Sequence, residues 1–194
     1  MLSKHLNNHN IENLLNLKSI SLIGFMGVGK STLGKNLSIK LGFQFFDTDK
    51  EIEKEKGMTI NDIFNNFGES YFRSLEEKVT LRLLEKQESV VISLGGGAYL
   101  NDNIREKLKK KTISIWLDTD IQIIISRLKK SKNIRPIAIK LKSNDDIEKL
   151  FNSRNQVYKK ADIRLNISTM GKTRILKLAI KQLKEYLMTY YAKT

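Results

Sequence analysis

Gly24-Phe25-Met26-Gly27-Val28-Gly29-Lys30-Ser31-Thr32 is the stretch of sequence that decides the fold. It matches the phosphate-binding pattern G-x-x-x-x-G-K-[ST] at every fixed position. Glycines leave the backbone free to turn its N–H groups toward phosphate oxygens, at the positive end of the helix that follows. The pattern therefore predicts a nucleoside-triphosphate site, in which Lys30 meets the β- and γ-phosphates and the hydroxyl of Ser31, next to Thr32, meets Mg²⁺.

The residues on either side supply the strand and the helix that this motif requires. Residues 20–23 are apolar except for Ser21 and predict a strand, whereas Leu33, Leu37 and Leu41 recur four apart as one stripe of a helix. Gly42 then stands where a helix C-cap is expected. A chance glycine-rich turn is the alternative, and both flanks disfavour it.

The length, composition and net charge of the chain are typical of a single-domain protein that binds anionic substrates. Its 194 residues, 40% of them hydrophobic, suit one α/β domain, and the absence of cysteine excludes disulfides and thiolate metal sites. There is no apolar run of membrane-spanning length and no signal-peptide core, so we expect a cytoplasmic enzyme that does not bind a membrane. We also expect a monomer. The net charge of +14 favours anionic substrates. Nucleic-acid binding is less favoured, because the lysines are not gathered into a recognition motif with interleaved aromatic residues.

The first 18 residues differ from the rest of the chain. They are rich in asparagine, and we expect a mobile extension or a short helix before a single domain at residues 19–194. His5 and His9 could share a helix face, but two histidines without a third ligand are a weak indication of a metal site.

Two aspartates follow a second predicted strand at residues 43–46. Asp47 and Asp49 lie where ligands bind in open parallel sheets, at the carboxyl end of a strand. One could hold the shell of a magnesium ion while the other faces the attacking nucleophile. The alternative is an N-cap for a helix that begins near Lys50, and both functions are compatible. Asp118, at the end of a strand predicted at residues 112–118, is a rival to Asp47, although it also suits the cap of the next helix.

Two arginines in the helical parts of the chain are candidates for anion binding. Arg73 lies three residues before Glu76 and four before Glu77, a spacing that predicts an ion pair. Most such pairs lie at the surface and contribute little, so the spacing alone is weak evidence of a site. Arg154 lies on the inward stripe of a helix predicted at residues 145–160. A cation placed there requires an anion from the protein or from a ligand.

Gly95-Gly96-Gly97 follows directly on an apolar strand at residues 89–94. Three glycines in this position indicate either backbone that approaches a ligand closely or a flexible turn, and the sequence leaves both open. Further along, residues 129–136 are polar and basic, which is typical of a mobile lid, and we expect this lid at about residues 129–143. Arg135 on such a lid could reach the transferred phosphate when the lid closes and excludes water.

Taken in order, these residues resemble one family, the shikimate kinases, over about residues 19–190. The resemblance rests on the phosphate-binding loop and on five further features: Asp47-Thr48-Asp49, Gly68-Glu69 with Phe72-Arg73 and Glu76, Gly95-Gly96-Gly97, Arg135-Pro136, and Arg154 with Tyr158. It implies an α/β fold, a three-layer α-β-α sandwich with a five-stranded parallel sheet and a mobile lid. It also implies transfer of the γ-phosphate of ATP to the 3-hydroxyl of shikimate.

The resemblance assigns roles to individual residues. The residues expected to bind ATP are Gly27, Val28, Gly29, Lys30, Ser31, Thr32 and, on the adenine side, Arg127. Ser31 would ligate Mg²⁺ directly and Asp47 through water. The residues expected to act in catalysis are Asp49, Lys30 and Arg135, and those expected to bind shikimate are Asp49, Arg73, Gly95, Gly96, Gly97 and Arg154.

Two other classes of function stay open from the sequence. A gluconate- or nucleotide-type kinase would use the same loop with another acceptor, and a nucleotide-dependent switch or basic nucleic-acid-binding module would use it without catalysis. A switch would not need Asp49, Arg73 and Arg154 together.

Overall fold

The structure is a computed structural model that describes residues 18–130, 141 and 143–191. Most of the expected N-terminal extension, with His5 and His9, lies outside these residues. So does most of the expected lid, including Arg135 and Pro136.

Five parallel strands form the centre of the fold, in the order β2-β3-β1-β4-β5. Their bounds are β1 Ser19–Ile23, β2 Gln44–Asp47, β3 Val90–Ser93, β4 Thr112–Asp118 and β5 Ile163–Asn166. Ile20 pairs with Val91 on one side and with Ile113 on the other, so β1 is central. The strands predicted at residues 20–23, 43–46, 89–94 and 112–118 are thus confirmed to within one residue at each end. β2 ends at Asp47 rather than Phe46 because Asp47 pairs in register with Ser93.

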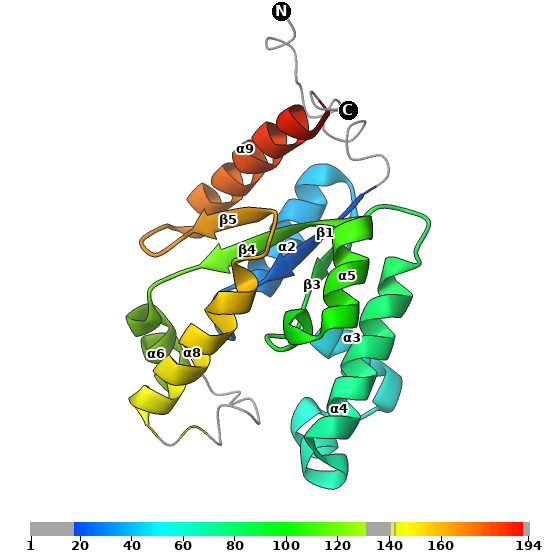
Figure 1. Ribbon diagram of the computed structural model, residues 1–194, viewed down its shortest axis with the longest axis vertical. Coiled ribbons are helices and arrows are strands. Elements are labelled where there is room, and N and C mark those ends of the chain that lie inside the picture. The colour runs from blue at the N-terminus through cyan, green and yellow to red at the C-terminus, as the bar shows by residue number, and fades with distance from the viewer. Residues whose placement is uncertain (1–17, 131–140, 142, 192–194) are drawn as a thin grey trace, which may run out of the picture.

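Helices cover both faces of this sheet, and the predicted three-layer α-β-α sandwich is confirmed (Figure 1). The helices are α2 Lys30–Leu41, α3 Thr48–Lys56, α4 Ile60–Leu84, the short 3₁₀ helix η1 Ala98–Leu100, α5 Asp102–Lys111, α6 Ile121–Lys130, α8 Asn144–Tyr158 and α9 Lys172–Tyr191. α2 and α9 pack on one face, through residues such as Leu37 and Leu183. α4 and α5 pack on the other, through residues such as Val79 and Leu108.

Strand residues alternate between the two cores, as the pleat of a strand requires. Leu22 and Ile115 belong to the core under α2 and α9, whereas Ile23 and Trp116 belong to the core under α4 and α5. Because all strands are parallel, their carboxyl ends meet at one edge of the sheet. The loop after β1, the aspartates after β2 and the glycine triplet after β3 are therefore brought to the same edge.

The long helix α4 is interrupted at Gly68. The sequence Asn65-Asn66-Phe67-Gly68 by itself predicts a break in the helical pattern at this point. Gly68 has φ 81° and ψ 176°, a conformation that a side chain would strain. The first segment is held by a capping box, in which Thr59 and Asp62 satisfy each other's backbone N–H groups. The break lets the second segment set its own direction, with Phe72 and Leu75 facing the core.

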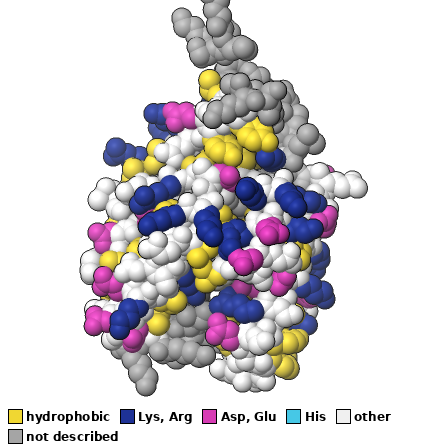
Figure 2. Space-filling view, viewed as in Figure 1, with side chains coloured by type: hydrophobic (Ala, Val, Ile, Leu, Met, Phe, Trp, Pro, Cys, Tyr) yellow, Lys and Arg dark blue, Asp and Glu magenta, His cyan; other side chains and the backbone are white. Residues whose placement is uncertain are grey.

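Charged side chains are spread over the surface. Figure 2 shows Lys and Arg across the visible face with Asp and Glu between them, and no single basic stripe. No helix among the described residues is long and apolar enough to span a membrane.

Candidate functional site

Lys30 folds back over the loop that precedes it. Its side chain is buried, and Nζ donates hydrogen bonds to the carbonyl oxygens of Gly24 at 2.8 Å and Phe25 at 3.0 Å. These contacts hold the ammonium group at the loop, where phosphate oxygens would accept stronger, charge-assisted hydrogen bonds from it. The loop is tightly packed, since a Cβ on Gly24 would lie 2.7 Å from the carbonyl oxygen of Leu117 on β4.

Ser31 and Asp47 meet at the carboxyl edge of the sheet. Ser31 Oγ donates a hydrogen bond of 2.5 Å to Asp47 Oδ2, and Ser93 Oγ lies 3.5 Å from Ser31 Oγ. Asp47 Oδ1 accepts from the backbone N–H groups of Asp49 at 3.1 Å and Lys50 at 3.4 Å, and so caps α3. The predicted N-cap is therefore confirmed, and the other carboxylate oxygen contacts the phosphate-binding loop through Ser31, whereas the magnesium role of Asp47 stays a prediction.

The oxygen atoms of Ser31 and Asp47 are the hard ligands that Mg²⁺ prefers. Within the described residues, no three His, Cys, Asp or Glu side chains form a metal-binding group. That absence is compatible with Mg²⁺, which usually takes one or two protein ligands and completes its shell with phosphate oxygens and water. The donor set at Ser31 and Asp47 therefore fits a magnesium nucleotide.

The glycine triplet is a buried surface against which charged side chains pack. A Cβ on Gly95 would lie 2.3 Å from Glu76 Oε1 and 2.8 Å from Asp49 Oδ1. A Cβ on Gly97 would lie 2.3 Å from Arg73 Nη1, and one on Gly96 would lie 3.1 Å from Arg154 Nη1. The side chains from α3, α4 and α8 thus meet at one short segment. Any side chain on these glycines would displace the charged groups, which is a packing reason for the triplet, and its close approach to a ligand stays a prediction.

Arg73 is held by two glutamates of its own helix. Nη1 donates to Glu76 Oε2 at 2.6 Å, and Nη2 donates to Glu69 Oε1 at 3.1 Å. Burial tends to lower the pKa of Arg73, but the two carboxylates outweigh it and the pKa is raised. The predicted pair with Glu76 is confirmed, and it is not a surface pair because the Glu76 side chain is only 2% exposed. Arg73 is therefore fixed in place and permanently charged.

Arg154 is buried on α8, as its place on the inward stripe predicts. Its guanidinium lies over the ring of Phe25, 5.4 Å from the centroid, and its Nε has no hydrogen-bond partner in the part of the chain that the structure describes. Burial lowers the pKa of Arg154, and the charge of Arg73 acts in the same direction. Tyr158, one turn further along α8, donates a hydrogen bond to the carbonyl oxygen of Gly96. A buried cation with an unused donor is suited to an anionic ligand.

Three other predicted residues lie elsewhere or outside the described part of the chain. Asp118 accepts hydrogen bonds from Arg164 Nε at 2.9 Å and Nη2 at 2.6 Å, so Asp47, and not its rival, contacts the phosphate-binding loop. Arg127 is exposed and donates to the carbonyl oxygens of Gly27 at 3.2 Å and Val28 at 3.1 Å, on the outside of the loop. Arg135 is not among the described residues.

Sequence reasoning gave Glu76 no role of its own, although Glu76 lies in the middle of the site. A signal was present, because Phe72, Leu75 and Val79 define the buried stripe of α4 and Glu76 falls beside them at helical spacing. Phe25 was missed for another reason. Its position in the loop pattern accepts any residue, and only the packing of α8 brings it under Arg154.

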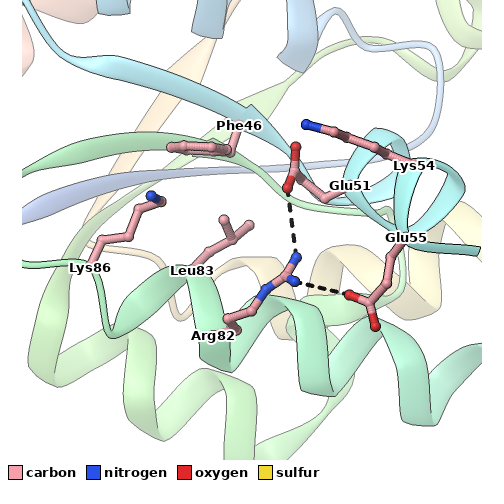
Figure 3. A pocket seen from close by; sticks show the side chains of 7 residues that line it. All are labelled: Phe46, Glu51, Lys54, Glu55, Arg82, Leu83 and Lys86. Atoms are coloured by element: carbon pink, nitrogen blue, oxygen red, sulfur yellow. Dashed lines mark ion pairs between the residues drawn. The ribbon is translucent and has the colours of Figure 1, made fainter.

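A separate cavity of about 410 Å³ lies between β2, α3 and α4, and none of the predicted site residues lines it (Figure 3). Figure 3 shows Arg82 between two carboxylates, Glu55 at 3.0 Å and Glu51 at 3.6 Å. The arginine of this cavity is therefore already paired.

Comparison with known proteins decides the family. The sequence model of the family described as Shikimate kinase matches residues 26–184. This chain belongs to the shikimate kinase family. It is 45% identical over 157 residues to a shikimate kinase of Persephonella marina. The aligned residues make up 81% of this chain and 92% of the relative. Its sheet and helices are those of a P-loop kinase fold.

Two solved shikimate kinases share the fold along most of their length. The enzyme from Aquifex aeolicus superposes with a TM-score of 0.76 at 36% identity, covering 86% of this chain and 96% of that one. The enzyme from Acinetobacter baumannii, solved in complex with shikimate, superposes with a TM-score of 0.80 at 32% identity. That match covers 92% of this chain and 98% of the other.

Proposed function

We propose that this chain transfers the γ-phosphate of ATP to the 3-hydroxyl of shikimate, giving shikimate 3-phosphate and ADP. The observation that carries the proposal is the meeting of Asp49, Arg73 and Arg154 at the glycine triplet, at the same sheet edge as the loop of Lys30. Two cations and one carboxylate are the groups that a small hydroxy acid requires. The family to which the chain belongs supports the same reaction.

On the phosphate side, the loop from Gly27 to Thr32 and the ammonium of Lys30 would hold the β- and γ-phosphates. Ser31 would ligate Mg²⁺ and Asp47 would hold a water of its shell, and the ion would neutralise charge on the phosphates. Arg127, against the outside of the loop, is the candidate for the adenine side.

On the acceptor side, Arg73 and Arg154 would bind the carboxylate, with the backbone of Gly95, Gly96 and Gly97 beside them. A hydrogen bond to a charged group contributes about 1.5–3 kcal/mol, so two of them select an acid over a neutral polyol. Asp49 would accept a hydrogen bond from the attacking hydroxyl, orient it and take its proton. Phosphoryl transfer needs mainly this positioning and charge neutralisation.

Several expectations from the sequence belong to the same proposal. We propose a monomeric, cytoplasmic enzyme whose domain spans residues 19–194, with residues 1–18 as an extension. Residues of about 129–143 would close as a lid and bring Arg135 to the transferred phosphate, which would exclude water from the reaction. What supports the lid is the basic, polar sequence of that segment.

One assay separates the proposed function from its alternatives. ADP release should require shikimate, and should not be supported by gluconate or by nucleoside monophosphates. Turnover with one of those acceptors and none with shikimate would overturn the proposal. Tight, salt-sensitive binding of duplex DNA would instead favour the basic nucleic-acid-binding module.

A further inference from the structure

Glu76 has a buried carboxylate oxygen without a hydrogen bond. The side chain is 2% exposed, and Oε2 accepts from Arg73 Nη1 at 2.6 Å. The other oxygen, Oε1, has no hydrogen-bond partner among the described residues. It faces the backbone of Gly95, and Asp49 Oδ1 borders the same position. Buried polar atoms without a partner are rare and costly, so this oxygen calls for a proton, a water or a ligand.

The contacts of Arg73 explain why the charge of Glu76 matters when an acid binds. Both terminal nitrogens of Arg73 already donate to carboxylates, one to Glu76 and one to Glu69. Each of these nitrogens carries a second N–H, so a substrate carboxylate that accepts from Arg73 would share the guanidinium with two other carboxylates. The side chain of Glu69 is 45% exposed and can turn into water. Glu76 is buried and cannot leave, so it can lose its negative charge only by taking up a proton.

The charges around Glu76 also favour its protonation when an acid binds. The titratable and charged groups that face it are Arg73 with Glu69 on α4, Asp49 on α3, and Arg154 with Tyr158 on α8. The guanidinium of Arg154 is buried and that of Arg73 is partly buried, and both face the carboxylates of Asp49 and Glu76. A substrate carboxylate adds one more negative charge, and an uncompensated buried charge is costly. Burial already raises the pKa of Glu76, and Asp49 raises it further, against the opposing effect of the two arginines.

We infer that binding of the acidic substrate is coupled to the uptake of one proton from solvent by Oε1 of Glu76. The proton comes from water or buffer and forms an O–H bond on Oε1, and no other covalent bond changes. Oε2 continues to accept the hydrogen bond from Arg73, now without competing as a charge. Glu76 is thus a positioning residue, which adjusts its own charge so that both arginines are available to the acid. The inference rests on the proposed function.

The experiment is calorimetric titration of the full chain with shikimate, in buffers of equal pH and different ionisation enthalpies. The dependence of the heat on the buffer gives the number of protons taken up. We expect this number to rise toward one as the pH is raised, and the Kd for shikimate to increase by up to about tenfold per pH unit in that range. Glu76→Gln, which is always neutral, should abolish the proton uptake and the pH dependence. Glu69→Gln, the matched control on the exposed partner of Arg73, should keep both.

Three outcomes overturn the inference. The first is clear binding of shikimate by the wild type without proton uptake at any pH tested. The second is a Glu76→Gln variant that takes up as many protons as the wild type, and the third is loss of the uptake in Glu69→Gln. If Glu76→Gln does not fold, the counts for the wild type and Glu69→Gln decide alone. Absence of any binding of shikimate would instead refute the proposed function, which distinguishes the two failures.

Discussion

The phosphate side of the site is a single continuous loop between β1 and α2, whereas the acceptor side is assembled from helices far apart in the chain. Lys30 contacts carbonyl groups only five and six residues away. Asp49, Arg73 and Arg154 come from α3, α4 and α8 and meet at a fourth segment, Gly95 to Gly97. A local loop is thus sufficient to position phosphates, but selection of the acceptor depends on long-range packing. Mutations on the acceptor side should therefore change the kinetic parameters for shikimate and leave the KM for ATP near its wild-type value.

The largest effect is expected for Asp49→Asn. A carboxylate that acts as a general base typically contributes about 10²–10⁴-fold to the rate, so kcat should fall by that order. The KM for ATP should change little, because the loop of Lys30 is untouched. Steady-state kinetics of the coupled ADP assay measure both. Asp118→Asn, which alters a carboxylate paired with Arg164, is the matched control and should keep the wild-type kcat. A near-normal kcat in Asp49→Asn would show that the acceptor hydroxyl needs no help from this carboxylate.

The next effect is expected for Arg154→Leu, which tests the acceptor side alone. Loss of a hydrogen bond to a charged group costs about 1.5–3 kcal/mol, so the KM for shikimate should rise by about 10- to 150-fold. The KM for ATP should stay near the wild-type value. Arg164→Leu on β5 is the control, since it removes an arginine that contacts Asp118 instead. An unchanged KM for shikimate would remove Arg154 from the binding of the carboxylate.

A smaller effect is expected for Gly97→Ala, which probes the backbone surface that the acceptor side shares. Gly97 has φ −102°, which alanine tolerates, but its Cβ would lie 2.3 Å from Arg73 Nη1. The guanidinium must shift, and the weakening of one charge-assisted contact should raise the KM for shikimate by up to about tenfold. Gly171→Ala is the control, because no described residue other than its chain neighbours has an atom within 4 Å of the added Cβ. Equal KM values in the two variants would mean that Arg73 is free to move without cost.

The smallest effect is expected for Tyr158→Phe and concerns stability. The lost hydrogen bond to the Gly96 carbonyl should reduce the free energy of unfolding at neutral pH by about 1 kcal/mol. Burial raises the pKa of Tyr158 from 10.0 to about 12, so the folded protein favours the neutral hydroxyl. Its contribution is complete below pH 10 and is lost as the pH rises through about 12.

Urea unfolding at several pH values measures this difference. The variant should lose less stability than the wild type in the alkaline range. Both proteins should still lose some stability as the pH rises, because the pKa of Tyr186 is also raised to about 12. If the free energy of unfolding depended on pH identically in the wild type and in Tyr158→Phe, the raised pKa of Tyr158 would be contradicted.

The elements of the fold could be read from the sequence because their signals are local. The strand at residues 112–118 is β4 without change, since its apolar run and its flanks are unambiguous. The break at Gly68 was predictable because a glycine after two asparagines interrupts the helical pattern. The end of β2 was predicted one residue short, since the pairing of Asp47 with Ser93 depends on a strand more than forty residues away.

The candidate site was predictable only in part. The pair between Arg73 and Glu76 follows from their spacing on one helix. Its burial does not, because burial depends on Gly95 and Gly97, which belong to another segment. The resemblance to a family supplied roles for the arginines but none for Glu76, whose free oxygen becomes visible only when its surroundings are known.

Residues 24–32 by themselves determine that this protein has a loop for phosphate groups, because a glycine-rich turn before a helix needs no distant partner. The alternation of strands and helices was likewise predictable from the local pattern of apolar and polar residues. Only the tertiary structure decided that two arginines, an aspartate and a buried glutamate share one surface. The physical reason is that the environment of a charge, its burial and its partners, is created by segments that meet when the sheet forms.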